Sequence, residues 1–400
     1  MNAHTTTTDH AARYLVGASR IDDPHTEQAQ DTLRRAYRAK VRPQCLCRPE
    51  SGAPMYIARA GGEFIIKRMP GSGMHHAPAC RSWLPPDHVS GYGRVAESAI
   101  VDDPDSGMTL LRLDFSLSKR PGAAPPDTSG EPADTVSDTP TKLTLRAMLH
   151  YLWDEAELTE WRPGFAGHRS WPVIFRRLRA AGDGKTVKKS SLADALFVPE
   201  PFDPEHKSQI NARRHAAWTP ARAGAGKKLM ILVGEIKKIE PARIGHRLII
   251  KHMPGCPLAL SDELYRRLYK RFGDDIALWE TDDTVHLVAI ATFAVAPTGL
   301  GSIDQLAVMT TDEHWIPFDS EPERLLTAAA IGEHRSFRKS LRYTLADSAS
   351  MAALVFTDTT EPTAAYIDTP ISDDTDPDVA EWHWDSTDVM PELPQRRDRR

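Results

Sequence analysis

The stretch Cys45-Leu46-Cys47, with His75-His76-Ala77-Pro78-Ala79-Cys80 further on, holds three of the four cysteines of this chain and two of its histidines. Two apolar-rich runs, Pro54–Ala60 and Glu63–Met69, lie between these clusters and are joined by Gly61-Gly62. This pattern predicts a β-hairpin with a glycine turn. Because a hairpin brings its two ends together, we expect the two clusters to lie side by side.

Thiolate sulfur and imidazole nitrogen are the zinc ligands of tetrahedral structural sites, which use four protein ligands. We therefore predict a site for structural Zn2+ made by Cys45, Cys47, Cys80 and His76, with His75 as the alternative fourth ligand. Neither cluster contains an acidic residue that could serve a metal-activated water, so a role in folding is expected. Two alternatives stay open: the cysteines are ordinary buried residues, or two of them form a disulfide.

Length and composition bound the class of protein. A chain of 400 residues is long enough for two or three domains. Its net charge of −5 excludes a uniformly basic nucleic-acid coat, so any contact with nucleic acid has to come from a local patch. Four cysteines and an N-terminus without signal-peptide features favour a cytoplasmic protein with no membrane partner. A small-molecule substrate is not expected.

The organisation expected from the sequence is α+β. Residues 118–142 contain no aromatic residue and, apart from Val136, no large aliphatic one, so they cannot offset their ordering entropy. The expected parts are an N-terminal helical arm (1–42), a zinc-ribbon-like β module (43–117), a disordered linker (118–142), a small helical, winged-helix-like unit (143–225), a mixed α/β domain (226–370) and a disordered acidic and basic tail (371–400).

The helical unit carries the basic residues that could meet nucleic acid. Apolar periodicity predicts helices at Leu143–Trp161 and Trp171–Ala181, with a short helical run at Ser191–Leu196. Three short helices with a basic second helix are typical of helix-turn-helix and winged-helix units, although exposed arginines are also ordinary on a solvated face. The candidate contacts with DNA or RNA are Arg176, Arg177, Arg179, Lys185, Lys188 and Lys189.

The second half of the chain alternates strands and helices. A helix is predicted at Ser261–Phe272 and another near Pro322–Glu333. Strands are predicted at Leu229–Lys237, Arg247–His252, Ile276–Glu280, His286–Ala294, Leu306–Thr310, Ala352–Thr357 and Ala364–Asp368.

The segment Cys45 to Trp83 resembles the start of an uncharacterised bacterial family, the domain-of-unknown-function family 1173. The similar motifs are CLC at 45–47, PMYIAR at 54–59, KRMPG at 67–71 and HAPAC at 76–80. Similarity continues through the helices at 143–158 and 170–181 and the strands after 229, so it covers nearly the whole chain. The resemblance implies a setting on plasmids and integrative conjugative elements, and it implies no established activity.

The C-terminal region also resembles, more faintly, the core of PD-(D/E)xK nucleases, in the runs 338–343, 354–359 and 365–367. Such enzymes hold a metal ion with carboxylates. Here Ala353 and Tyr366 stand at the acidic positions, and no lysine follows in register. The carboxylates left as candidates are Glu333, Asp358 and Asp368, so the resemblance implies a degenerate nuclease fold.

The function expected from these observations is that of a zinc-binding, non-catalytic protein of a mobile genetic element. Its expected partners are DNA or a DNA-transfer or maintenance complex. One alternative is a divergent metal-dependent nuclease. The other is a protein-interaction scaffold that docks a partner through its acidic tail and makes no contact with nucleic acid.

Overall fold

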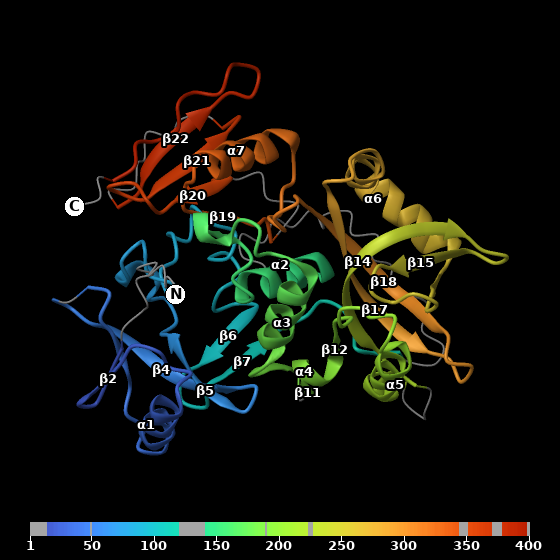
Figure 1. Cartoon of the computed structure of the whole chain (residues 1–400), viewed down its shortest axis with the longest axis horizontal. Helices are drawn as coiled ribbons and strands as arrows, with labels where there is room; N and C mark the ends of the chain where they lie inside the picture. Colours follow the sequence, from blue (N-terminus) through green and yellow to red (C-terminus); the bar gives the residue numbers. More distant parts are fainter. Residues whose placement is uncertain are drawn as a thin grey trace, which may run out of the picture.

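The computed structural model describes residues 14–48, 50–119, 141–188, 190–222, 227–343, 351–369 and 378–397. An N-terminal sheet and a C-terminal sheet lie at one end of the molecule, and a β-barrel lies at the other, with helices between them (Figure 1). This is the expected α+β class. Most of the predicted linker, residues 371–377 of the predicted tail and the candidate Lys189 lie outside the described residues. Among the described helices, none combines the length and apolar character needed to cross a bilayer.

The N-terminal sheet contains the predicted hairpin. Its strands, in spatial order, are β2 (Ser19–Ile21), β1 (Tyr14–Val16), β3 (Gln44–Cys45), β4 (Ala53–Ala60) and β5 (Glu63–Arg68). β4 and β5 pair antiparallel from Met55↔Arg68 to Ala60↔Glu63, which confirms the hairpin. Gly61 and Gly62 both have positive φ, as a two-residue turn of this kind requires. Helix α1 (Glu27–Arg38) packs on this sheet through Leu33, and Thr26 caps its first turn.

A second, four-stranded sheet joins segments from both sides of the predicted linker. β7 (Met108–Leu111) lies parallel to β10 (Lys185–Val187), with β6 (Ile100–Asp103) and β11 (Ser190–Ser191) at the edges. Helices α2 (Leu145–Glu155), α3 (Trp171–Gly182) and α4 (Leu192–Ala195) pack beside it. Their apolar side chains share one core with the barrel, so these helices do not pack as a separate unit.

Helix α2 is buried around most of its circumference and encloses His150, which is 1% exposed. The Nδ1 atom of His150 hydrogen-bonds the carbonyl oxygen of Arg342 at 2.8 Å. Burial, assisted by the charge of Arg146 and opposed by that of Asp319, lowers the pKa of His150 to about 3. The folded protein therefore keeps this imidazole neutral where the unfolded chain, with an ordinary pKa near 6.5, protonates it.

The resulting prediction concerns acid stability. Above pH 6.5 the neutral His150 leaves the free energy of unfolding unaffected by its titration. Below pH 6.5, each further pH unit should lower the free energy of unfolding by about 1.4 kcal/mol until the pKa of His150 in the folded protein is reached. Urea midpoints measured between pH 4.5 and 7.5 should fall less steeply with acid in His150→Asn, which cannot protonate. The exposed His75→Asn is the control. Equal slopes in both variants would contradict the prediction.

The barrel is built from five strands that close on themselves. They are β14 (Met230–Pro241), β15 (His246–Ile250), β16 (Leu258–Leu260), β17 (His286–Val295) and β18 (Gly301–Thr311). β14 pairs with β15 through its second half and with β17 through its first, and β16 pairs in parallel with β18. The order around the barrel is β14-β15-β16-β18-β17 and back to β14. Helix α6 (Asp262–Thr281) connects β16 to β17.

The two-sided pairing of β14 requires the strand to bend. A bulge lies between Ile236 and Lys238, where the partner changes from β17 to β15. Gly234 precedes it, and a Cβ at this position would lie only 2.9 Å from Cγ2 of Ile250. Numbered within the barrel, the strand order is 1-2-3-5-4-1 with a helix between strands 3 and 4. This is the order of the oligonucleotide- and oligosaccharide-binding (OB) fold.

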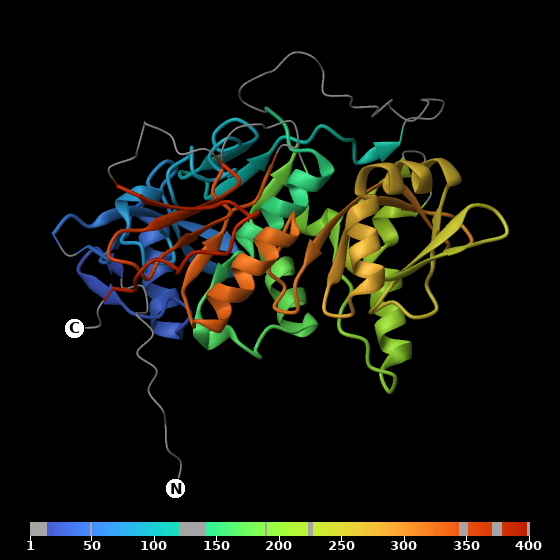
Figure 2. The ribbon, with the colours of Figure 1, turned by 90° about the horizontal axis from the view of Figure 1, so that it is seen from above.

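Further segments surround the barrel. The short strand β12 (Leu196–Phe197) extends it beside β14. Helix α5 (Lys207–Ala217) leads to Trp218, which packs on Phe293 and Phe197. β8 (Ser118–Lys119) pairs with β13 (Lys227–Lys228). Figure 2 shows the barrel and its surrounding segments separated from the N-terminal sheet by α2 and α3.

One predicted strand was wrong. Residues 276–280 belong to α6, which the sequence interpretation ended at Phe272. The backbone at Phe272 is indeed non-helical, with φ −128° and ψ 27°, but the helix resumes at Gly273. The prediction was wrong because a kink followed by a glycine looks locally like the end of a helix. The helix continues because Ile276, one turn further on, packs in the core.

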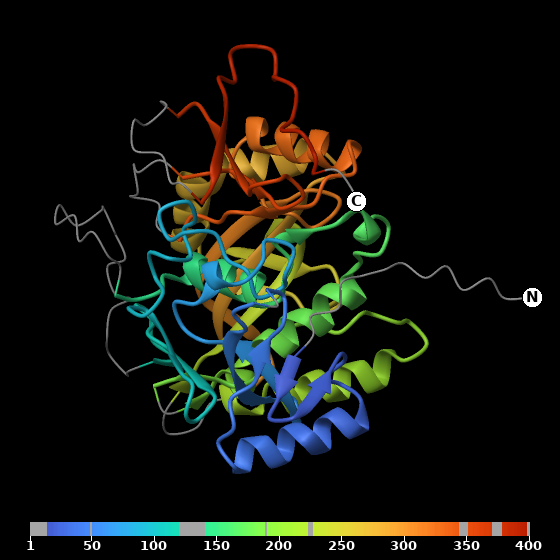
Figure 3. The same ribbon diagram turned by 90° about the vertical axis from the view of Figure 1, so that its left-hand side faces the viewer.

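The C-terminal sheet consists of β22 (Ala380–Trp384), β21 (Thr363–Ile367), β20 (Leu354–Phe356), β19 (Phe337–Lys339) and β9 (Glu160–Trp161). Helix α7 (Glu321–Gly332) packs on it (Figure 3). β22 corrects the expectation of a disordered tail from 371 onward. It pairs in parallel with β21, and Trp384 is buried against the core of this sheet. The expectation rested on the acidic composition of this segment. Packing of Trp382 and Trp384 on the core of the sheet stabilises the strand in spite of that composition.

Candidate metal centre

Four side chains converge where the N-terminal sheet meets the loop after β5. The ligand atoms of Cys45, Cys47, His76 and Cys80 all lie within 4.8 Å of one another. The Sγ atoms of Cys45 and Cys80 are 3.7 Å apart. Nδ1 of His76 lies 3.5 Å from Sγ of Cys47 and 3.8 Å from Sγ of Cys80. The four residues predicted from the sequence are therefore the four that the fold brings together.

Local structure explains the convergence. Cys45 ends β3, where it pairs with Tyr14 on one side and Ala53 on the other. The β4–β5 hairpin then returns the chain to the same end of the sheet. A short 3-10 helix, η1 (Gly73–His75), turns the backbone so that His76 is fully buried. The side chain of His75 is exposed instead, so the geometry selects His76 as the fourth ligand.

The spacing fits tetrahedral zinc. A Zn–S bond of about 2.3 Å places two sulfur ligands about 3.8 Å apart, close to the Cys45–Cys80 separation. The backbone N–H groups of Ala77 and Ser82 donate to the sulfur atoms of Cys47 and Cys80 at 3.4 Å, which favours thiolates. All four cysteines are free thiols in this structure, so no disulfide links the cysteines of the cluster. Four protein ligands leave no open position for substrate, as in structural sites.

The thiols also need a cation if all are to ionise. Hydrogen bonds to Cys47 and Cys80, together with burial, raise the pKa of the Cys45 thiol well above its ordinary value. A divalent ion would remove this constraint because it replaces the shared protons with positive charge. The donor set is therefore suited to Zn2+.

The cluster joins two hydrophobic cores. Cys45 lies in the core of the N-terminal sheet, which Cys47 and Cys80 also contact. Cys80 and Met74 also contact the cluster formed by Trp83 and Val89 with one face of the C-terminal sheet. Arg338 of β19 donates to the carbonyl oxygen of Trp83 at 2.9 Å. A metal ion here would hold the N-terminal sheet against the C-terminal one.

A cavity of about 890 Å³ opens beside this cluster, between β5, the loop at 69–87 and the α2–β9 segment. Charged residues line it, and a buried network crosses its wall: the carboxylate of Glu155 lies 2.5 Å from Nζ of Lys185 and 3.7 Å from Nζ of Lys67. Burial would raise the pKa of Glu155, but these two ammonium groups outweigh it and hold that pKa below the ordinary value. This network was not predicted from the sequence. The available signal was the pair of carboxylates, Asp154 and Glu155, at the end of a helix with a long apolar stripe.

The candidate nucleic-acid contacts do not share a surface. Lys185 is only 5% exposed and pairs with Glu155, so it is not a nucleic-acid contact. Arg177 donates to the carbonyl oxygen of Ala156 and to Glu157, which ties α3 to α2. Arg176 is exposed, while Arg179 and Lys188 line a different cavity. The contact surface predicted for this unit is therefore wrong for Lys185 and stays a prediction for the exposed residues.

The three candidate carboxylates are placed apart. The only group of three or more potential ligands that meet in the described residues is the Cys45 group. Asp358 binds the Arg335 guanidinium through both oxygens, and Asp368 accepts from the backbone and hydroxyl of Ser386. Glu333 is exposed at the end of α7. The structure gives these residues separate structural surroundings and not a shared metal site.

Comparison with known proteins gives one match. A family model described as "Protein of unknown function (DUF1173)" matches residues 15–397. No curated protein and no solved structure matches the chain.

Proposed function

The chain belongs to the DUF1173 family of proteins of unknown function, and we propose that it is a zinc-stabilised protein that binds single-stranded nucleic acid through the outer face of its barrel. The observation that carries this proposal is the closed barrel with the OB strand order. In this fold the ligand face is made by the second and third strands with the loops that flank them. Those strands are β15 and β16, and the loops are 241–246 and 295–301.

The residues on this face suit a polyanion. Leu248 and Ile250 of β15 point into the barrel core, so Arg247 and Ile249 lie on the outer side. Arg243 and Ile244 form the tip of the 241–246 loop, where Ile244 is 86% exposed. Within the described part of the chain, neither Arg243 nor Lys237 forms an ion pair. Figure 1 places this loop at the far edge of the molecule, away from the N-terminal sheet.

One carboxylate moderates the charge of this face. Glu240 lies opposite Arg247 across the β14–β15 pair and forms an ion pair with Lys238 at 2.5 Å. The cations still outnumber it, so the face is basic although the chain as a whole carries −5. Local basic patches of this kind contact phosphates and make binding dependent on salt.

The zinc site contributes to this function indirectly. It lies at the opposite end of the molecule from the β15 face (Figure 2), so its proposed role is to maintain the fold. The mobile-element setting implied by the family resemblance stays a prediction, as does the association with a DNA-transfer complex.

The test compares oligonucleotide binding by wild type and by Arg243→Ala/Arg247→Ala. Fluorescence anisotropy with a labelled single-stranded 20-mer should show an affinity loss of roughly tenfold or more at about 100 mM salt, since two phosphate contacts are removed. The slope of log K against log salt should also become shallower by about 1.4. Arg35→Ala/Arg38→Ala removes two exposed arginines of α1 and is the charge-matched control.

Three results would count against the proposal: salt-independent binding, equal loss in the control pair, or no binding at low salt. The last result would favour the alternative of a scaffold that does not contact nucleic acid. Stronger binding of duplex than of single strands would assign a different ligand to the face.

A further inference from the structure

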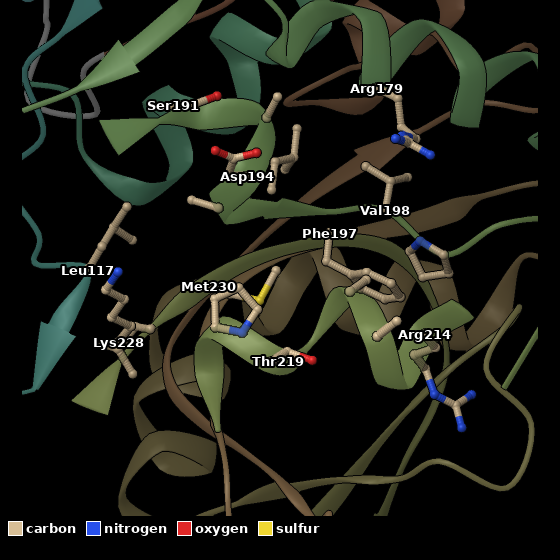
Figure 4. A pocket seen from close by; sticks show the side chains of 18 of the residues that line it. Leu117, Arg179, Ser191, Asp194, Phe197, Val198, Arg214, Thr219, Lys228 and Met230 are labelled. Carbon is tan, nitrogen blue, oxygen red and sulfur yellow. The ribbon is translucent and has the colours of Figure 1, made fainter. Parts of the chain in front are cut away.

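A second cavity, of about 950 Å³, lies between the barrel and the α3–α4 segment. α3 and α4 form one wall, α5 and the turn at Thr219 form another, and β12 with the end of β13 and the start of β14 forms the floor (Figure 4). His252 and Met253, in the turn after β15, complete the lining. This volume is at the upper end of the range of small-molecule sites, about 300 to 1,000 Å³.

The charged groups of this cavity favour an anion. Arg179, Lys188 and Lys228 are exposed at its margin and form no ion pair within the described residues. Arg214 is only 9% exposed, and its Nε atom is buried without a hydrogen-bond partner. The main opposing charge is Asp194.

The remaining carboxylate is already neutralised. Glu200 accepts two hydrogen bonds from Arg213, from Nε at 3.0 Å and from Nη2 at 2.9 Å. With Glu200 paired in this way, Asp194 is the carboxylate of the described lining that is left to oppose the four cations Arg179, Lys188, Arg214 and Lys228. In Figure 4 the guanidinium group of Arg179 lies above the Phe197 ring, that of Arg214 lies below it and points away from Arg179, and Lys228 lies at the other end of the view.

The floor between these cations is aromatic and apolar. Phe197 and Phe175 are both partly exposed to the cavity, and Met230 and Val198 lie beside them. Trp218 packs edge-on against Phe197 and holds its ring, with centroids 5.5 Å apart. The Arg179 guanidinium lies 5.8 Å from the centre of the Phe175 ring. Aromatic faces flanked by cations suit a flat base attached to a phosphate.

Hydrogen-bonding groups accompany the aromatic rings. Asp194 and the hydroxyl groups of Ser191 and Thr219 line the cavity. A carboxylate accepts from the exocyclic amino group of a base, as Asp and Glu do with cytosine. The lining therefore offers a separate partner for the base, the apolar surface beneath it and the phosphate.

We propose that this cavity binds one nucleoside-phosphate unit, with the base on Phe175 and Phe197 and the phosphate at Arg179. The unit is either a free nucleotide or one residue of a nucleic-acid strand. The free-nucleotide form is independent of the proposed barrel function, and the strand form extends it.

The first experiment is calorimetric titration of the full chain with adenosine 5′-monophosphate, adenosine and inorganic phosphate. The nucleotide should bind at least about tenfold more tightly than either part, because only it engages both the rings and the cations. Arg179→Gln should weaken nucleotide binding by about tenfold, and Phe175→Leu should do so while retaining apolar volume. Arg176→Gln, three residues away on the same helix and outside the cavity, is the matched control.

The two sources are distinguished with a five-nucleotide oligodeoxyadenylate. Tighter binding of the mononucleotide indicates a free nucleotide, and tighter binding of the oligonucleotide, still sensitive to Arg179→Gln, indicates a strand. Arg243→Ala/Arg247→Ala should leave mononucleotide binding unchanged, so failure of the barrel proposal remains separable. Equal binding of phosphate and nucleotide, equal effects of Arg176→Gln and Arg179→Gln, or no binding of either nucleotide probe at millimolar concentration would overturn the proposal.

Discussion

Replacing Cys47 by serine is expected to abolish zinc binding and to detach the N-terminal sheet from the rest of the protein. Cys47 supplies one of the four convergent ligand atoms, and the cluster joins the cores of two sheets. Structural zinc sites contribute roughly 10 kcal/mol or more of apparent binding free energy, so a loss on the order of 5 kcal/mol in stability is expected. Elemental analysis should give one zinc per wild-type chain and none in the variant. Limited proteolysis should cut the variant first within residues 43–90.

The chain provides matched controls for this result. Cys256→Ser alters the cysteine that lies outside the cluster and should retain zinc. His76→Ala should lose the metal, whereas His75→Ala should keep it, because only His76 is buried in the cluster. Zinc lost from His75→Ala but kept by His76→Ala would show that the ligand assignment is wrong. Full zinc content in Cys47→Ser would refute the site.

Replacing Asp358 by alanine is expected to destabilise the C-terminal sheet by about 3 to 5 kcal/mol, because it leaves the Arg335 guanidinium buried without its counter-charge. Arg335 is 1% exposed, and its Nη2 atom donates to Oδ1 of Asp358 at 2.9 Å. Asp358 also accepts from the backbone N–H of Ser336 at 2.9 Å. The effect should appear as a lower urea midpoint.

Glu333→Ala is the comparison, since Glu333 was proposed for the same metal site but is exposed. Its urea midpoint should stay close to that of wild type. An Asp358→Ala variant with unchanged stability, together with magnesium-dependent DNA cleavage lost on that substitution, would restore the nuclease alternative. The expected pattern instead assigns Asp358 to the fold.

Local sequence was sufficient for the features that depend on neighbouring residues. The Gly61-Gly62 pair and the flanking apolar runs predicted the β4–β5 hairpin, and the hairpin predicted the meeting of Cys45 and Cys47 with Cys80. Apolar periodicity predicted most helices, including α2 and α3. These patterns reflect periodicity and turns within a few residues. They predict helices and hairpins because the contacts that form such elements join residues close together in the sequence.

Other features required pairing across the chain. The β22 strand forms because β21 is available to it, although its own composition is acidic. Lys185 resembled a surface cation until the fold placed it beside Glu155, some thirty residues earlier in the sequence. No periodicity in either segment records that partner. The choice of His76 over His75 likewise depends on which side chain η1 turns inward.

The sequence by itself thus determined the three cysteines of the candidate metal site, the class of the fold and most of its helices. The tertiary structure alone decided that β14 pairs with β17 through one half and with β15 through the other, which closes the barrel. It also decided which basic side chains face solvent, as on the outer side of the barrel, and which are buried in ion pairs, as Lys185 of β10 is. The physical reason is that strand pairing and charge burial are set by contacts between distant segments, whose free energy depends on the whole packed chain.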